Sequence, residues 1–255
     1  MKIFDTHAHY DDKQFDNDRD TLLSQCMEEG IGTIVNIGAS IETSKNTLQL
    51  IDKYPFMYGA VGVHPSETKD LTEADMEWLK QVSTHEKVVA IGEIGLDYYW
   101  DEPDREIQKH WFVRQLDIAK KVDLPVVIHS RDAAKDTLDI MKREKAEKVG
   151  GVIHCYSYHV ELAKEYIKMG FYLGIGGVVT FNNGKKLKEV VEEIPLEHLV
   201  LETDCPYLAP VPNRGKRNHS LNLTYVVEEI SRLKNISKEE VIAVTTENAK
   251  KLYRL

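Results

Sequence analysis

The 255-residue sequence has few cysteines and no long apolar run. Its three cysteines cannot all pair with one another, which excludes a disulfide scaffold and favours reduced thiols. No stretch approaches the roughly 20 apolar residues of a membrane span, and the opening MKIFDTHAHY lacks the apolar core of a signal peptide. We therefore expect a cytoplasmic protein that does not bind membranes.

Positive charge is also scarce. The chain has 33 Lys and Arg against 42 Asp and Glu, a formal net charge of −9. Such acidity argues against a broad basic surface for nucleic acid, although local phosphate binding through metal ions stays open. With 42% hydrophobic and 29% charged residues, the composition is that of a globular protein with a large core, which excludes disorder and fibrous repeats.

Short β-branched runs alternate with longer amphipathic stretches along the chain. Strands that alternate with helices predict parallel pairing with the helices outside. Eight such runs, one per about 32 residues, match the βα unit of a barrel. We therefore predict an α/β fold: a single-domain (β/α)8 TIM barrel over residues 1–255, in preference to a doubly wound open sheet. The expected strands are 3–9, 33–38, 57–64, 88–97, 125–131, 151–155, 171–176 and 199–205.

Two of the helical stretches carry start signals. Thr72 with Asp75, and Ser237 with Glu240, have the spacing of a capping box. Each pair therefore predicts the first turn of a helix.

Two histidines, His7 and His9, form the sharpest chemical feature, at the end of the first run. Side chains two residues apart on a strand point to the same side, and two imidazoles on one face suit a metal ion. A chance pair that is hydrogen-bonded in the core would explain this motif alone equally well.

Histidines and carboxylates recur at the ends of other predicted strands. Catalytic residues of barrel enzymes lie at the carboxyl ends of the strands, so these side chains should converge on one mouth. Four histidines and two acids exceed the three protein ligands of a mononuclear catalytic zinc site, so we predict two divalent ions, with Glu93 as the candidate bridge. Such ligands accept Zn, Mn, Mg, Fe or Co, so the ions stay unnamed. The predicted ligands are His7, His9, Glu93, His129, His154 and Asp204.

Several other polar residues are candidates for binding the substrate. Arg214, Lys216 and Arg217 form the one tight basic cluster at the expected mouth, where they can grip a phosphate backbone; a solvated loop is the alternative. Arg131 shares a strand face with His129 and can bind phosphate or form a salt bridge with Asp132. His64 can contact the substrate or support a ligand.

Three neighbouring aromatic residues, Tyr98, Tyr99 and Trp100, follow Glu93. They can stack on bases, as in proteins that bind single strands, or form a packed wall. Asp97 or Tyr98 can also orient a ligand imidazole.

The cysteines next to the predicted ligands look structural. Cys155 follows His154 and Cys205 follows Asp204. Because successive side chains on a strand alternate between its faces, both thiols are expected to point away from the metal ions.

The motifs FDTHAHYD, VGVHP, IGEIGLDYY, PVVIHSRDA, VIHCYS, LETDCPYLAP and RGKRN resemble those of the TatD-family metal-dependent hydrolases, part of the amidohydrolase group of binuclear-metal barrels. The resemblance implies that His7, His9 and Asp204 bind one metal ion, that His129 and His154 bind the second, and that Glu93 bridges them. The chain departs from the family pattern at His219-Ser220, where relatives usually have Glu-Pro, and at Tyr158, where glycine is common. These departures bear on substrate preference.

The resemblance also implies a function. Several family members are deoxyribonucleases with 3′ to 5′ exonuclease activity, so we expect hydrolysis of phosphodiester bonds in single-stranded DNA ends. A monomer is the default expectation, which the resemblance does not address. In such a site two metal ions activate a water molecule, with Asp204, Glu93 and His64 as the catalytic residues. The alternatives are an ester or amide hydrolase, such as a D-aminoacyl-tRNA deacylase, and a non-catalytic metal-binding barrel.

Overall fold

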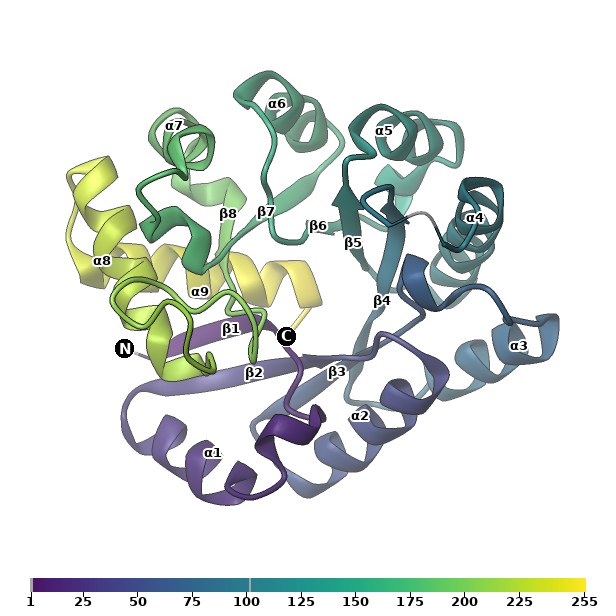
Figure 1. Cartoon of the computed structure of the whole chain (residues 1–255), viewed down its shortest axis with the longest axis horizontal. Coiled ribbons are helices and arrows are strands. Elements are labelled where there is room, and N and C mark those ends of the chain that lie inside the picture. The colour runs from purple at the N-terminus through teal and green to yellow at the C-terminus, as the bar shows by residue number, and fades with distance from the viewer. Residues whose placement is uncertain (1, 101) are drawn as a thin grey trace. The chain divides into compact units, whose positions relative to one another are not determined.

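The computed structural model describes residues 2–100 and 102–255. In this part of the chain, eight strands alternate with helices (Figure 1). The strands are β1 Ile3–Ala8, β2 Ile31–Ile37, β3 Met57–Val61, β4 Val88–Asp97, β5 Val126–Arg131, β6 Gly151–Ile153, β7 Phe171–Ile175 and β8 Leu199–Leu201. The α-helices are α1 Arg19–Glu28, α2 Ile41–Lys53, α3 Glu73–Val82, α4 Arg105–Val122, α5 Ala134–Arg143, α6 Val160–Lys168, α7 Lys185–Glu193, α8 Leu223–Lys234 and α9 Lys238–Tyr253. Short 3-10 turns are η1 Lys13–Phe15, η2 Pro65–Glu67, η3 Ala146–Lys148, η4 Gly177–Thr180, η5 Leu196–His198 and η6 Ser220–Asn222.

The described residues form two compact units. The first contains residues up to 36, residues 155–167 and residues 172–255; the second contains residues 37–154 and 168–171. Within the first unit, β1 pairs in parallel with β2, and β7 with β8. Within the second, β3, β4, β5 and β6 pair in parallel in this order. The predicted parallel pairing is confirmed in both units.

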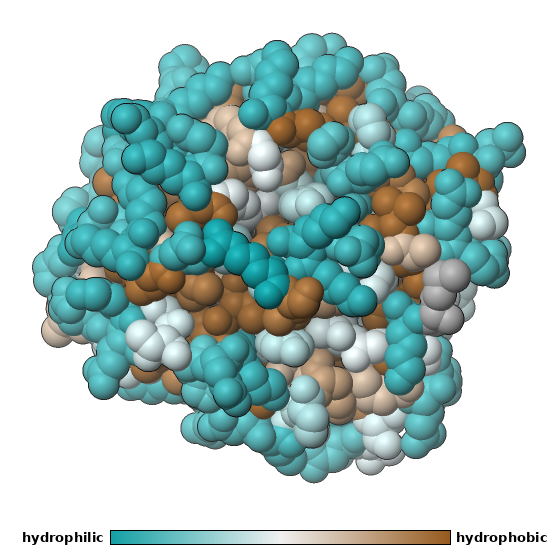
Figure 2. Space-filling model, turned by 180° about the vertical axis from the view of Figure 1, so that it is seen from behind, coloured by the Kyte–Doolittle hydropathy of each residue, from teal (hydrophilic) through white to brown (hydrophobic). Residues whose placement is uncertain are grey.

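The strands are buried on both faces, as expected when helices cover a parallel sheet. All ten residues of β4 are buried, and α4 packs against this strand (Figure 1). Hydrophilic side chains cover much of the face in Figure 2, with apolar patches between them. Within residues 2–100 and 102–255, no helix is long and apolar enough to cross a membrane.

Helix starts follow local sequence signals. The Thr72 hydroxyl accepts the N–H of Asp75, whose carboxylate accepts the N–H of Thr72 in return, so the predicted capping box is present. The Ser237 hydroxyl accepts the N–H of Glu240 at the start of α9. Both signals were therefore readable from neighbouring residues alone.

Three predicted strands end at least two residues earlier than expected. β3 stops at Val61, β6 at Ile153 and β8 at Leu201. His64, His154 and Asp204 therefore lie in the connections that follow these strands, because the backbone turns there: Pro65 opens η2, and Cys155 and Asp204 have positive φ angles of 45° and 56°.

Candidate metal centre

The first cluster consists of His7, His9 and Asp204. His7 lies near the end of β1 and His9 directly follows the strand. Their Nε2 atoms are 3.1 Å apart and lie 3.6 and 3.4 Å from Asp204 Oδ1. The N–H of Asp204 donates to the His7 carbonyl (2.9 Å), and the N–H of His9 donates to the Cys205 carbonyl (2.8 Å). These backbone bonds hold the end of β1 beside the segment after β8.

The spacing of these three ligand atoms fits a divalent cation. In a tetrahedral site with metal–ligand bonds of about 2.0–2.1 Å, neighbouring ligand atoms lie about 3.3–3.4 Å apart. The three observed separations, 3.1, 3.4 and 3.6 Å, fall around this value. Two imidazoles and one carboxylate also match the three protein ligands that a catalytic zinc site uses.

Asp5 contacts the first cluster, because the backbone N–H of His7 donates to Asp5 Oδ1 (3.3 Å). Its buried carboxylate accepts hydrogen bonds from Ser220 Oγ (2.7 Å), Thr203 Oγ1 (2.7 Å) and the N–H of Thr203 (3.0 Å). Burial raises the pKa of Asp5 to about 7. The hydrogen bonds act in the opposite direction, but their effect on the pKa is smaller than that of burial. Sequence reasoning assigned Asp5 no role, although it directly precedes the Thr-His-Ala-His run. The Ser220 departure from the family pattern supplies one of these bonds.

The second cluster consists of His64, Glu93, Asp97, His129 and His154. Glu93 and Asp97 lie on β4, and His129 lies on β5 between their carboxylates. His129 Nδ1 is 2.7 Å from Glu93 Oε1, and its Nε2 is 3.0 Å from Asp97 Oδ2. Burial lowers the pKa of His129, but the hydrogen bonds to Asp97 and Glu93 outweigh this effect and raise the pKa above its usual value. The two carboxylates thus draw positive charge into this position.

Gly95 allows the two carboxylates of β4 to approach His129 on β5. Its φ of +144° and its position opposite His129 in the β4–β5 ladder leave no room for a side chain, because a Cβ would lie 1.9 Å from the His129 carbonyl oxygen. Glu93 and Asp97 lie two residues to either side of Gly95, so both face His129. The close approach of β4 to β5 therefore builds the His129 contacts.

Glu93 Oε1 is the common neighbour of three imidazoles in the second cluster. Besides His129 Nδ1, it lies 3.6 Å from His154 Nε2 and 3.9 Å from His64 Nε2. A buried carboxylate oxygen among several imidazole nitrogens is a donor set that fits a divalent cation.

His64 differs from the other imidazoles. The backbone N–H of Ser66 donates to His64 Nδ1 (3.1 Å), so the proton of the neutral ring lies on Nε2. Burial and the nearby His129 lower the pKa of His64 to about 3, so the ring is neutral near pH 7. In this tautomer the ring donates a hydrogen bond from Nε2 toward the cluster.

The predicted substrate-binding residues have different surroundings. Arg217 forms a bidentate ion pair with Asp18 (2.8 and 2.5 Å) and also donates to the Gln14 carbonyl, so its guanidinium is already engaged. Arg214 lies over the Phe181 ring, 4.3 Å from its centroid, and Arg131 lies over the Tyr99 ring at 3.8 Å. Lys216 is exposed.

The expected direction of Cys155 is wrong. A Cys155 Sγ that pointed away from the ligands would be far from Asp204, yet it lies within 4.8 Å of a carboxylate oxygen of that residue. The alternation of side chains does not apply, because β6 ends at Ile153 and Cys155 has a φ of 45°. Cys205 is buried, as expected.

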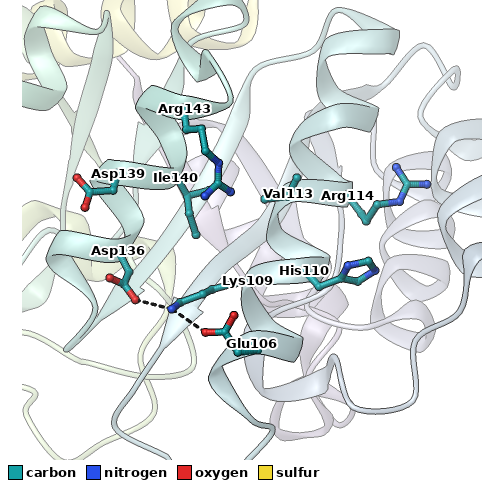
Figure 3. Close-up of a pocket in the computed structure, with 9 residues that line it drawn as sticks. All are labelled: Glu106, Lys109, His110, Val113, Arg114, Asp136, Asp139, Ile140 and Arg143. Carbon is teal, nitrogen blue, oxygen red and sulfur yellow. Dashed lines mark hydrogen bonds and ion pairs between the residues drawn. The ribbon is translucent and has the colours of Figure 1, made fainter.

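A groove of about 460 Å³ lies between α4 and α5 (Figure 3). Lys109 bridges Glu106 and Asp136 in its wall, at 2.9 Å from each carboxylate. None of the residues that line this groove belongs to either cluster, so this hollow is separate from the candidate metal ligands.

The chain is similar in sequence to a family of hydrolases. The sequence profile of a family described as TatD related DNase matches residues 4–254. An uncharacterized metal-dependent hydrolase of Bacillus subtilis (strain 168), YabD, is 49% identical over 253 residues, with 99% of both chains covered. YcfH of Escherichia coli (strain K12), with the same description, is 34% identical, covering 100% of this chain and 97% of the relative.

Solved structures agree. The crystal structure of YjjV, a TatD homologue from Escherichia coli K12, matches with a TM-score of 0.93 and 30% identity, covering 99% of this chain and 98% of that one. This match confirms the predicted fold class, a (β/α)8 barrel, against the open doubly wound sheet.

Proposed function

The chain belongs to the TatD family of metal-dependent hydrolases, and from this premise we propose that it cleaves phosphodiester bonds in DNA, removing nucleotides from single-stranded 3′ ends. The observation that supports the proposal is the pair of ligand clusters, whose members lie in the carboxyl-terminal half of a parallel strand or in the connection that follows it. That end of the strands carries the catalytic residues in barrel enzymes.

We propose two divalent ions per chain. His7, His9 and Asp204 would hold one, and Glu93, His129 and His154 would hold the other. His64 is left out of both sets because its Nδ1 accepts the N–H of Ser66 and its Nε2 lies 3.9 Å from Glu93 Oε1, farther than the nearest nitrogen of either other imidazole. Divalent ions at such a site supply Lewis acidity, which activates water at neutral pH and offsets the charge that develops on phosphoryl oxygens.

The chain's own residues would transfer the proton, stabilise the transition state and bind the substrate phosphates. The Asp204 carboxylate is the group that accepts a proton from the attacking water. The neutral His64 ring donates a hydrogen bond from Nε2 to a phosphoryl oxygen, which favours the transition state, where that oxygen is most negative. Arg131 at the end of β5 and, separately, Arg214 and Lys216 after β8 pair with phosphates of the substrate.

A panel of substrates tests this proposal. Purified protein with Mg²⁺, Mn²⁺ or Zn²⁺ is incubated with 5′-labelled single-stranded DNA, a simple ester and an aminoacyl-tRNA. We expect a ladder of labelled DNA products shortened from the 3′ end. His129→Asn should abolish the ladder, and His85→Asn, which changes an imidazole that contacts Asp52 on the surface, should leave it intact.

Other outcomes have clear meanings. Cleavage of only the ester or the aminoacyl bond would replace the nuclease with an ester or amide hydrolase that uses the same ligands. Cleavage of no substrate, with two ions bound, would favour a metal-binding barrel without turnover. We further propose a cytoplasmic monomer that does not bind membranes, with DNA as its partner.

A further inference from the structure

An exposed aromatic pair follows β4. The side chains of Tyr99 and Trp100 are 55% and 57% exposed, which is unusual for such large rings. The two rings meet edge to face, with centroids 4.9 Å apart. The Arg131 guanidinium covers one face of Tyr99 at 3.8 Å. Three planar groups are therefore arranged together at the surface.

The backbone of this pair is tied to the second cluster by one carboxylate. Asp97 Oδ1 accepts the N–H of Tyr99 (2.9 Å), and Asp97 Oδ2 contacts His129 Nε2 (3.0 Å). The N–H of Tyr98 also donates to the Arg131 carbonyl (2.8 Å), which joins the end of β4 to that of β5. Tyr99 is thus held one side chain away from a candidate metal ligand.

Tyr98, in the same segment, is a packed aromatic residue and serves as a comparison. Its hydroxyl donates to Asp136 (2.7 Å), and the Arg105 guanidinium covers its ring at 4.3 Å. Tyr98 is therefore part of a wall, whereas Tyr99 and Trp100 leave aromatic surface in solvent.

We propose that Tyr99, Trp100 and Arg131 form a stacking platform for a nucleobase of single-stranded substrate; the proposal rests on the function proposed above. Every base has a π face, so aromatic side chains and a guanidinium plane bind a strand without regard to its sequence. The chain carries a net charge of −9, so charge attraction to the DNA backbone is weak and stacking supplies affinity in its place. Arg131 adds positive charge for the adjoining phosphate.

Kinetics on two matched substrates test the platform. One is an oligothymidylate, and the other has the same phosphates but abasic sites at its last 3′ positions. For the metal-loaded wild type we expect KM to be about tenfold higher on the abasic strand, within the range that stacking of one base gives. The double variant Tyr99→Leu/Trp100→Leu should raise KM about tenfold on oligothymidylate, change kcat less than twofold, and leave KM on the abasic strand unchanged.

A matched control is Trp78→Leu. Trp78 is a half-buried tryptophan on α3 that is also covered by a cation, Lys45, at 5.5 Å, but it lies outside the platform. This variant should behave like wild type on both strands. The platform is overturned if the double variant keeps the wild-type KM on oligothymidylate, or if its KM rises equally on both strands, which indicates damage to the fold or to backbone binding.

A fluorescence titration separates this proposal from the proposed function. Oligothymidylate should quench tryptophan emission of the wild type and not of Trp100→Phe, and the abasic strand should quench neither. If the wild type cleaves no DNA, the nuclease proposal fails, while base-dependent quenching still supports the platform. Absence of quenching overturns the platform whether or not DNA is cleaved.

Discussion

The Nε2 atoms of His7 and His9 lie 3.1 Å apart, and both are within 3.6 Å of the same oxygen of Asp204. This convergence predicts how metal content responds to substitution. His9→Ala should remove about one divalent ion per chain, and His129→Ala should remove the other, because each cluster would lose a ligand. His64→Asn should keep both ions, because His64 Nε2 is a donor. Elemental analysis of dialysed protein measures this, and loss of an ion in His64→Asn would contradict the assigned tautomer.

The pH dependence of activity tests the role of His64 directly. Because burial lowers its pKa to about 3, only about one ring in a thousand is protonated at pH 6, and the side chain does not titrate between pH 5 and 9. His64→Asn should therefore lower kcat about 100-fold, as loss of one transition-state donor does, and leave both limbs of the pH profile in place. If the alkaline limb of the pH–kcat profile disappears in this variant, His64 instead acts as a proton donor.

The two basic residues at the end of the 214–217 loop should behave differently. Arg217 is paired with Asp18, so Arg217→Ala should lower the free energy of unfolding by about 1 kcal/mol, and Asp18→Ala should do the same. The exposed Lys216 should affect only DNA binding: Lys216→Ala should raise KM and reduce the salt slope of binding by about one, with no change in stability. Equal loss of stability in all three variants would contradict this division.

Gly95→Ala should be strongly destabilising. A Cβ at this position would lie 1.9 Å from the His129 carbonyl oxygen, so β4 and β5 must separate. We expect a loss of more than about 2 kcal/mol, measured by urea denaturation. Gly170→Ala is the control: Gly170 also has a positive φ, 80°, but its Cβ would meet nothing within 4 Å, so only the backbone cost of about 1 kcal/mol should appear. Equal losses would show that packing against β5 is unimportant.

Glu229 provides a stability prediction with a defined pH window. Hydrogen bonds from Arg232 and Lys188 lower its pKa from 4.5 to about 2. A carboxylate whose pKa is depressed on folding stabilises the protein above the unfolded value, and this stabilisation is lost as the pH falls from about 4.5 through about 2.

Glu229→Gln should therefore lower the free energy of unfolding by about 1 kcal/mol at pH 7. The loss is no larger because Arg232 is exposed and solvent screens its charge. The difference in stability from wild type should vanish near pH 2. Chemical denaturation at both pH values measures it, with Glu197→Gln as a variant of an exposed acid. A difference that persists at pH 2 would rule out the ionised carboxylate as its source.

The order of strands and helices along the chain was predictable from the sequence, and the sequence also showed which residues to propose as metal ligands. Alternating apolar runs and capping pairs such as Thr72–Asp75 act through residues close in the chain, so they are readable without a structure. Barrel enzymes carry their catalytic residues toward the carboxyl ends of the strands, and this rule led to the proposal of His7, Glu93 and His129 as ligands.

Tertiary structure decided the chemical state of those residues, because it depends on groups distant in sequence and on local turns. Asp5 is held by Ser220, 215 positions away, and Asp97 joins His129 to the backbone of Tyr99. A positive φ at Cys155 reversed the expected direction of its thiol. Such contacts follow from how strands approach and where they end, which the periodicity of a sequence does not encode.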